Sequence, residues 1–250
     1  MKPVSIIGAG PGALDLLTQR AIDRLDEADV LVWTDSLIPP KIAEVPHKSC
    51  ERIATSSLTL EEILPILINK AKEGKKVVRL HDGDPCLFGA LSEQIFRLKS
   101  AGLEVEVIPG ISAYQATAAT LQAELTIPGL TQTIILSRAG GRTGIPEKER
   151  LEKLAALNSS LCLYLSARHV KDVEQILLNY YPSNTPVAIG YRVSWEEEWI
   201  KIVPLNLMAE TSTKKGLIRT TIYIISPALK SSDQRSKLYN SSYNHLFRRN

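Results

Sequence analysis

The predicted fold depends most on one stretch of the chain, Arg79-Leu80-His81-Asp82-Gly83-Asp84-Pro85-Cys86-Leu87-Phe88-Gly89. It begins in an apolar run, residues 76–80, that is typical of a short buried strand. A sharp loop follows, because Gly83 tolerates backbone angles that a side chain would forbid and Pro85 fixes its own φ. Residues 90–98 then predict a helix. Open α/β sheets bind ligands at the carboxyl ends of their strands, so this is a candidate binding loop, although ordinary strand-to-helix turns also contain Gly and Pro.

Length and composition indicate a globular protein. The chain has 250 residues, enough for one large domain or two smaller ones, with 44% hydrophobic and 23% charged residues. Its apolar runs are shorter than the ~20 residues that a membrane helix needs, and a strand predicted directly after Met1 leaves no room for a signal peptide. The three cysteines (Cys50, Cys86 and Cys162) have neither disulfide nor metal spacing. We therefore expect a cytoplasmic protein without a metal.

The positive net charge of +3 belongs to the last residues of the chain. Residues 230–250 carry five Lys or Arg and one Asp, so residues 1–229 are slightly acidic. The pI near 8.7 is therefore no argument for nucleic-acid binding by the body of the protein. Residues 230–250 are rich in Ser and Asn and lack apolar periodicity, which predicts a disordered tail.

A second glycine-rich loop follows the first predicted strand, residues 4–7. Its residues, Gly8-Ala9-Gly10-Pro11-Gly12-Ala13, match the dinucleotide-binding pattern G-x-G-x-x-A. Asp35, after the next predicted strand, lies where a ribose-binding acid belongs. An NAD-dependent dehydrogenase is therefore an alternative. Pro11 counts against it, because proline removes an N–H from a loop that would bind phosphates.

Apolar periodicity and turn residues predict two α/β domains, residues 1–125 and 126–229, followed by the tail of residues 230–250. Strands alternate with helices in the first domain, which predicts a parallel sheet with helices on its faces. The second domain lacks helices between some strands, so its sheet should be mixed. The expected strands are residues 4–7, 29–33, 76–80, 103–108, 133–137, 161–165, 186–191, 198–203 and 220–225. The expected helices are residues 16–25, 59–73, 90–98, 113–122, 146–157 and 170–179.

Three motifs together resemble the tetrapyrrole methylases, which use S-adenosylmethionine. They are Gly-x-Gly-Pro-Gly-x-x-x-Leu-Leu-Thr from Gly8, Arg-Leu-x-x-Gly-Asp-Pro-x-x-Phe-Gly from Arg79, and Pro-Gly-Ile-Ser-Ala from Pro109. The resemblance covers almost all of residues 1–229. It implies two α/β domains with a cleft between them, and a homodimer.

Two further segments narrow the resemblance. Residues 123–133 and 137–147 look like those of the precorrin-4 C11-methyltransferases of cobalamin (vitamin B12) biosynthesis. The implied activity is methyl transfer to C11 of precorrin-4 or cobalt-precorrin-4. Gly140 is a departure, because the family often has Glu there, and so is Leu14, where the opening loop often has Asp. A methylase of the same fold acting on another precorrin, uroporphyrinogen III, ribosomal RNA or diphthine stays open, as does a binding module without activity.

The resemblance also implies site residues. Arginine suits a substrate with many carboxylates, since it pairs with carboxylates in a bidentate manner. Transfer from a sulfonium mainly needs alignment of the reacting atoms, so no catalytic triad or metal is expected. The implied cofactor contacts, for S-adenosylmethionine and its product S-adenosylhomocysteine, are Asp82, Gly83, Asp84, Leu87, Ser112, Ala113, Leu165, Tyr191 and Thr221. The substrate candidates are Gly10, Pro11, Asp35, Ser36, Arg138 and Arg142, followed by Arg79 and Arg192.

No catalytic residue stands out. His81 and Asp35 are the candidates for proton transfer, but a hydrogen-bonded structural role is the stronger interpretation of His81. Asp84 also has a simpler interpretation, since an Asp before Pro often caps the next helix. The expected partner is a small tetrapyrrole, with no nucleic acid and no membrane.

Overall fold

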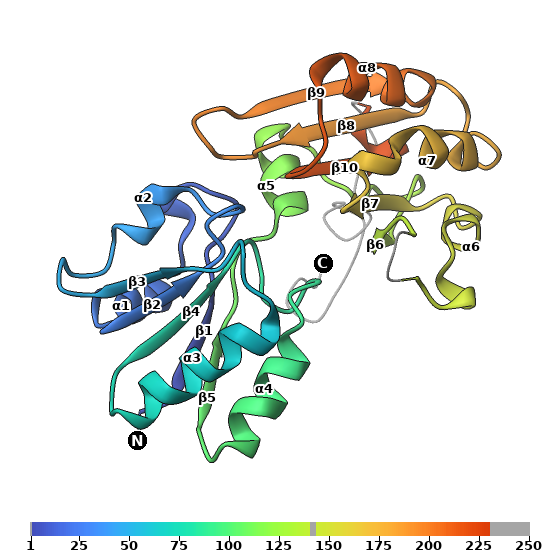
Figure 1. The fold of residues 1–250 in the computed structure, drawn as a ribbon. Helices are drawn as coiled ribbons and strands as arrows, with labels where there is room; N and C mark the ends of the chain where they lie inside the picture. Colours follow the sequence, from blue (N-terminus) through green and yellow to red (C-terminus); the bar gives the residue numbers. More distant parts are fainter. Residues whose placement is uncertain (1, 141–143, 231–250) are drawn as a thin grey trace, which may run out of the picture. The chain divides into compact units, whose positions relative to one another are not determined.

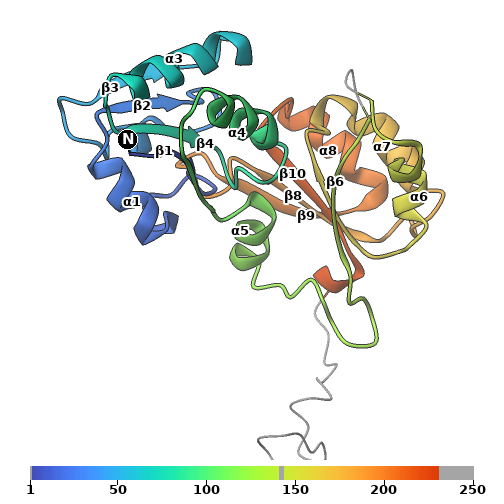
Figure 2. The same cartoon turned by 90° about the horizontal axis from the view of Figure 1, so that it is seen from below.

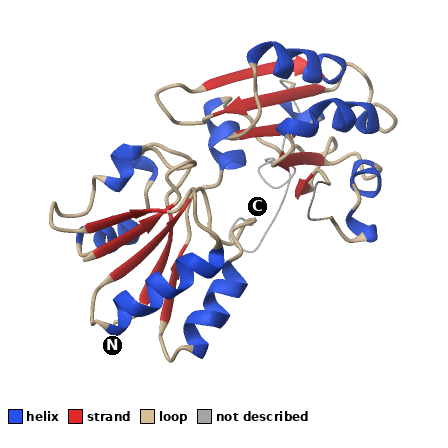
Figure 3. Cartoon of the chain, viewed as in Figure 1, coloured by secondary structure: helices blue, strands red, loops and turns tan. Residues whose placement is uncertain are grey.

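The computed structural model describes residues 2–140 and 144–230, so Arg142 and most of the predicted tail lie outside the described residues. By their contacts, these residues divide into two compact units. The first unit runs to Ala116 and also contains Arg192–Glu197. The second contains Thr117–Tyr191 and the residues from Glu198 on. Figure 1 shows both units along the chain, and Figure 3 shows their helices and strands.

The first unit is built on a parallel sheet of five strands in the order β3-β2-β4-β1-β5 (Figure 1). The strands are β1 (Val4–Gly8), β2 (Val30–Trp33), β3 (Glu51–Ala54), β4 (Val77–His81) and β5 (Val105–Ile108). The central strands β1 and β4 are buried at every position, as strands covered on both faces must be. The predicted parallel sheet is confirmed.

Helices cover both faces of this sheet. One hydrophobic cluster joins Ile7 and Leu80 to α1 (Gln19–Asp26) and α2 (Pro40–Ala43). The other joins Ile6 and Val32 to helices α3 and α4. Neighbouring residues of β1 thus point to opposite faces, as strand geometry requires. The other helices of this part are α3 (Leu60–Lys72), α4 (Leu91–Ser100) and α5 (Ala113–Thr120), which continues into the second unit.

Thr59 caps α3, which lies within the predicted helix of residues 59–73. Its backbone N–H donates to Glu62 Oε2 (2.7 Å), one half of a capping box. Two elements of the first unit were not predicted, β3 and α2. β3 carries mostly exposed residues at the edge of the sheet, so it lacks an apolar pattern, and α2 has only four residues.

The second unit has a mixed sheet in the order β6-β7-β10-β8-β9 (Figure 1), which confirms the prediction. Figure 2 shows the same unit from below. β6 pairs with β7 in parallel, and the other pairs are antiparallel. The strands are β6 (Ile134–Arg138), β7 (Ser160–Tyr164), β8 (Pro186–Tyr191), β9 (Trp199–Pro204) and β10 (Thr221–Ile225).

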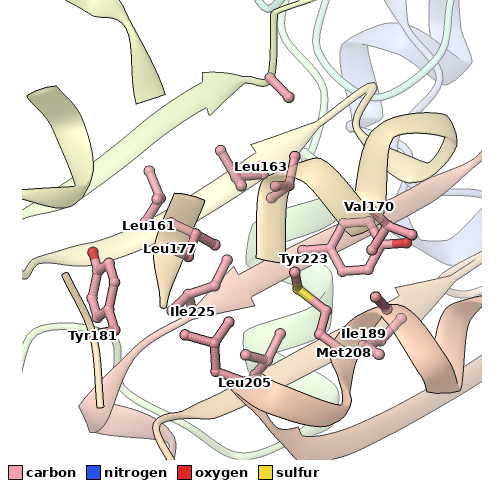
Figure 4. Packing of buried hydrophobic residues seen from close by; sticks show 14 of the residues in the cluster. Leu161, Leu163, Val170, Leu177, Tyr181, Ile189, Leu205, Met208, Tyr223 and Ile225 are labelled. Atoms are coloured by element: carbon pink, nitrogen blue, oxygen red, sulfur yellow. The ribbon is translucent and has the colours of Figure 1, made fainter. Parts of the chain in front are cut away.

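Three helices pack on this sheet through one hydrophobic cluster, part of which Figure 4 shows from close by. They are α6 (Leu151–Ala155), α7 (Val170–Leu177) and α8 (Met208–Lys215). Tyr223 lies in the cluster, fully buried, together with Leu177 and Met208. α8 was not predicted, because only Met208, Ala209 and Ser212 of its residues are buried, too few for an apolar period.

Among the described residues, no helix is long and apolar enough to cross a membrane.

Candidate functional site

Three glycine loops meet at the carboxyl ends of β1, β4 and β5. A Cβ atom on Gly110 would lie 2.1 Å from the carbonyl oxygen of Gly83, and one on Gly8 would lie 2.5 Å from the same oxygen. Gly10 and Gly83 also exchange backbone hydrogen bonds of 3.2 and 2.9 Å. The backbones therefore approach as closely as only glycine allows, and the three motifs form one layer.

Asp84 ties two of these loops together. One carboxylate oxygen, Oδ2, accepts the backbone N–H of Gly110 (3.1 Å), and the other accepts that of Cys86 (2.7 Å). α4 begins only at Leu91. The carboxylate therefore holds the loops after β4 and β5 in register, a different role from that of a helix cap.

Six of the predicted cofactor contacts come together on these two loops. Asp82 is exposed, while Gly83, Asp84 and Leu87 are half-buried. Ser112 is buried, with its Cα 3.9 Å from a Cβ built on Gly83, and Ala113 begins α5. Phe88 and Ala90 adopt positive φ angles of 57° and 49°, which non-glycine residues rarely do.

His81 is a buried, neutral histidine. Its exposed fraction is 7%, its Nε2 lies 3.3 Å from the Gln94 side-chain amide, and Gln94 Nε2 donates to the Gly89 carbonyl (2.9 Å). Burial and the charge of Arg79 lower the pKa of His81 to about 4, against the weaker opposite effect of Gln94. This environment supports the structural interpretation of His81.

The Arg79 side chain, on the central strand β4, is buried. It is 5% exposed, and its guanidinium donates to the Val32 carbonyl, Thr34 Oγ1 and Thr55 Oγ1, all at 3.3 Å. Within the described part of the chain, its Nε has no hydrogen-bond partner. Burial lowers the pKa of Arg79 to about 10, so the side chain stays charged at neutral pH. These contacts join the ends of β2 and β3, which argues against the expected substrate contact.

Asp35 and Ser36 follow β2, as expected, but the Asp35 carboxylate already has partners. Its Oδ1 accepts the backbone N–H groups of Thr55 (3.0 Å) and Ser56 (2.8 Å), and its Oδ2 accepts the Ser56 hydroxyl (2.7 Å). Burial alone would raise the pKa of Asp35, but these hydrogen bonds outweigh it and the pKa is lowered. Asp35 is therefore a charged group that fixes the segment after β3.

In the second unit, the predicted contacts Tyr191 and Thr221 are paired with each other. Thr221 begins β10 and lies opposite Tyr191, the last residue of β8. Leu165 directly follows β7, and the pairing of Tyr223 with Leu163 places it at the same edge. This edge is strained, because Leu165 and Thr220 both have a φ of 52°.

Arg138 ends β6 opposite Tyr164, so it also lies at this edge of the second sheet. It is half-buried, and its Nη2 donates to the carbonyl of Gly144 (2.6 Å). For Gly140, in the loop that follows, a built Cβ would lie 4.0 Å from Ile145 Cδ1, the only near atom among the described residues.

The loop at Gly10 and Pro11 has partners that sequence reasoning missed. The indole N–H of Trp195 donates to the Pro11 carbonyl (3.0 Å), and Ser194 Oγ accepts the backbone N–H of Ala13 (2.9 Å). No local pattern could reveal contacts across more than 180 positions of the chain.

These bonds also bear on the dehydrogenase alternative. The N–H groups of Gly10 and Ala13 are used within the protein, and Pro11 has none. The short 3-10 turn Leu14–Leu16 separates the loop from α1, so the N-terminus of α1, at Gln19, does not directly follow the loop. A dinucleotide pyrophosphate needs both features, so the loop does not suit it.

The fold and the loops define a class of protein with two α/β units, each of which has candidate binding loops at the ends of its strands. The chain belongs to the Tetrapyrrole (Corrin/Porphyrin) Methylases, whose family model matches residues 3–208. It is 38% identical to a cobalt-precorrin-4 C(11)-methyltransferase of Methanocaldococcus jannaschii, over 99% of this chain and 96% of the relative. A precorrin-4 C(11)-methyltransferase of Pseudomonas aeruginosa is 34% identical, with 98% of both chains covered.

A solved structure agrees with this membership. The crystal structure of a cobalt precorrin-4 methyltransferase of cobalamin biosynthesis is 37% identical, with a TM-score of 0.88 over 91% of this chain and 96% of that one.

Among the described residues, no group of three His, Cys, Asp or Glu side chains is arranged to hold a metal ion.

Proposed function

We propose that this protein transfers a methyl group from S-adenosylmethionine to C11 of precorrin-4 or cobalt-precorrin-4 in cobalamin biosynthesis. The observation that carries the proposal is the meeting of three glycine loops, in which all three methylase motifs contact one another and Asp84 fixes the register of two of them. Similarity over nearly the whole chain to two C11-methyltransferases supports the choice of substrate.

The loops after β4 and β5 suit the methyl donor. They present backbone groups together with the carboxyl group of Asp82, whose pKa is raised by burial and which, when ionised, can accept hydrogen bonds from the amino group of a methionine moiety. This cofactor supplies an activated methyl group. The residues that would hold it are Asp82, Gly83, Asp84, Leu87, Ser112 and Ala113. Leu165, Tyr191 and Thr221 are further proposed contacts from the second unit.

The remaining work of the chain is binding and alignment. Arg138 and Arg142 would pair with substrate carboxylates, and the Arg138 guanidinium has five donors, one of which binds Gly144. Gly10, Pro11 and Ser36 would line the tetrapyrrole. Because the carbon nucleophile of an electron-rich ring needs only orientation toward the methyl group, neither His81 nor Asp35 has to act as a base. We further propose that the protein is a cytoplasmic homodimer. Sedimentation of the purified protein would measure its oligomeric state.

The deciding experiment is incubation with S-adenosylmethionine labelled in its methyl group, using precorrin-4, cobalt-precorrin-4 and uroporphyrinogen III as separate substrates. One labelled methyl at C11, located by mass and carbon-position analysis, is the expected result and shows which ring form is used. Transfer to uroporphyrinogen III alone would move the protein to another activity of the same family. Binding of the cofactor without transfer to any of the three would refute the proposed substrate.

A further inference from the structure

The Gly10–Ala13 loop depends on a distant segment for its shape. Gly10 and Gly12 have positive φ angles of 68° and 148°, so the loop contains two residues with wide conformational freedom. Its Gly10 end is bound to Gly83. The bonds that fix the other end come from Arg192–Glu197, which we call the β8–β9 segment.

Trp195 fits against this loop so closely that only glycine is tolerated at position 12. A Cβ atom there would lie 2.3 Å from Cδ1 and 2.6 Å from Nε1 of the indole ring. The same Nε1–H donates to the Pro11 carbonyl (3.0 Å). Ring and hydrogen bond together set the position of Pro11, while Ser194 Oγ sets that of Ala13 (2.9 Å).

The β8–β9 segment is itself held in one conformation. The Trp195 backbone N–H donates to the Arg192 carbonyl (2.9 Å), and the Arg192 guanidinium carbon lies 5.0 Å from the centre of the Trp195 ring. Arg192 also pairs with Glu197 (3.1 Å). Arg192 and Ser194 have positive φ angles of 45° and 63°, and such strained residues persist where surrounding contacts determine them.

We propose that Trp195, assisted by Ser194, is a positioning residue that holds the Gly10–Ala13 loop in the shape that recognises the tetrapyrrole substrate. This inference rests on the proposed function, in which Gly10 and Pro11 contact that substrate. Asp84 fixes the methyl-donor loops after β4 and β5, and they bind the Gly10–Ala13 loop through Gly10, the end that Trp195 and Ser194 do not hold. Loosening the Gly10–Ala13 loop should therefore weaken substrate binding and leave cofactor affinity unchanged.

Trp195→Phe is the main test, because it keeps an aromatic ring and removes the indole N–H. Loss of one such hydrogen bond predicts a KM for the tetrapyrrole about three- to tenfold higher, with kcat and the Kd of S-adenosylhomocysteine within about twofold. Ser194→Ala should act in the same direction. Trp199→Phe is the matched control, since Trp199 lies on β9 beside Lys215, and its KM should equal that of the wild type.

Hydrogen–deuterium exchange of peptides covering residues 9–17 separates this inference from the proposed function. Faster exchange in Trp195→Phe than in Trp199→Phe is the expected result, and unchanged exchange would overturn the positioning role without any substrate. If exchange rises and the wild-type enzyme is active but KM is unchanged, the loop is held for another purpose and the inference is wrong. If the wild type methylates no tetrapyrrole, the proposed function fails and the substrate part of the inference fails with it.

Discussion

Asp84 shows how one carboxylate can organise a binding loop. It accepts two backbone N–H groups from loops that follow different strands, at 2.7 and 3.1 Å. In Asp84→Asn, the amide keeps one oxygen acceptor and places an NH2 group against the second donor. A hydrogen bond to a charged group contributes about 1.5–3 kcal/mol, so the affinity for S-adenosylhomocysteine should fall roughly ten- to hundredfold.

Calorimetric titration with S-adenosylhomocysteine measures this change. Cys86→Ala is the control, because it keeps the backbone N–H that Asp84 accepts and removes only the thiol beside that carboxylate. Equal affinities in Asp84→Asn and Cys86→Ala would show that the register of these loops does not matter for the cofactor.

His81 should make the free energy of unfolding depend on pH. Its pKa is about 4 in the folded protein and 6.5 in an ordinary environment, so the unfolded chain binds the proton more tightly. The stability is fully present above pH 6.5 and is lost as the pH falls toward 4. The loss should amount to about 3 kcal/mol at pH 4, and His81→Gln should remove it.

Urea denaturation of both proteins at several pH values gives the comparison, because all other titrating groups are common to both. Parallel pH profiles for the wild type and His81→Gln would contradict a buried neutral histidine.

At the scale of elements, α7 and α8 are joined by a buried carboxylate. Glu174 of α7 is 8% exposed, and its Oε2 accepts the backbone N–H of Ala209 in the first turn of α8 (2.6 Å). This satisfies a free N–H at a helix start and places a negative charge at the positive end of the helix dipole. Glu174→Ala should therefore destabilise the protein by about 2–3 kcal/mol.

Thermal or urea unfolding tests this prediction against Glu210→Gln on the same helix. Glu210 pairs with Lys214 at the surface, where an ion pair contributes at most about 1 kcal/mol, so this control should be nearly neutral. A loss in Glu174→Ala no larger than in the control would show that the contact does not stabilise α8.

The elements that the sequence predicted are those whose burial leaves a pattern. β1 and β4 are buried at every position, so their apolar runs are unambiguous. β3 escaped prediction because it is a mostly exposed edge strand, and α8 because it buries few side chains. Local sequence carries no signal for such elements, which form because their neighbours in the fold complete them.

The features of the candidate site were also predictable only in part. The place of Asp82, Gly83 and Asp84 in a loop directly after β4 was predictable, because that loop has a recognisable order of residues; their contact with the cofactor stays a prediction. The partners of Asp35 and the contacts of Ser194 and Trp195 were not, because each joins segments brought together only by folding. Arg79 was expected at the substrate, but its side chain is buried and bonded to the ends of β2 and β3, which argues against that expectation.

At the scale of the whole molecule, ligand binding should raise the free energy of unfolding. A ligand that binds only the folded state at 100 times its Kd adds about 2.7 kcal/mol. S-adenosylhomocysteine should therefore raise the Tm, and NAD should not, because the N–H groups of Gly10 and Ala13 are already used and Pro11 has none. Differential scanning fluorimetry compares the two ligands, and a Tm raised by NAD alone would favour the dehydrogenase.

The first unit is discontinuous in sequence, since it includes Arg192–Glu197 as well as the residues up to Ala116. A hybrid gene that joins residues 1–116 of this chain to the remainder of a relative would keep Gly12 but replace Trp195 by a foreign residue. Such hybrids should work only where the relative also has an aromatic side chain that Gly12 can accommodate. A functional hybrid therefore needs the six residues of the β8–β9 segment and the amino-terminal half from the same parent.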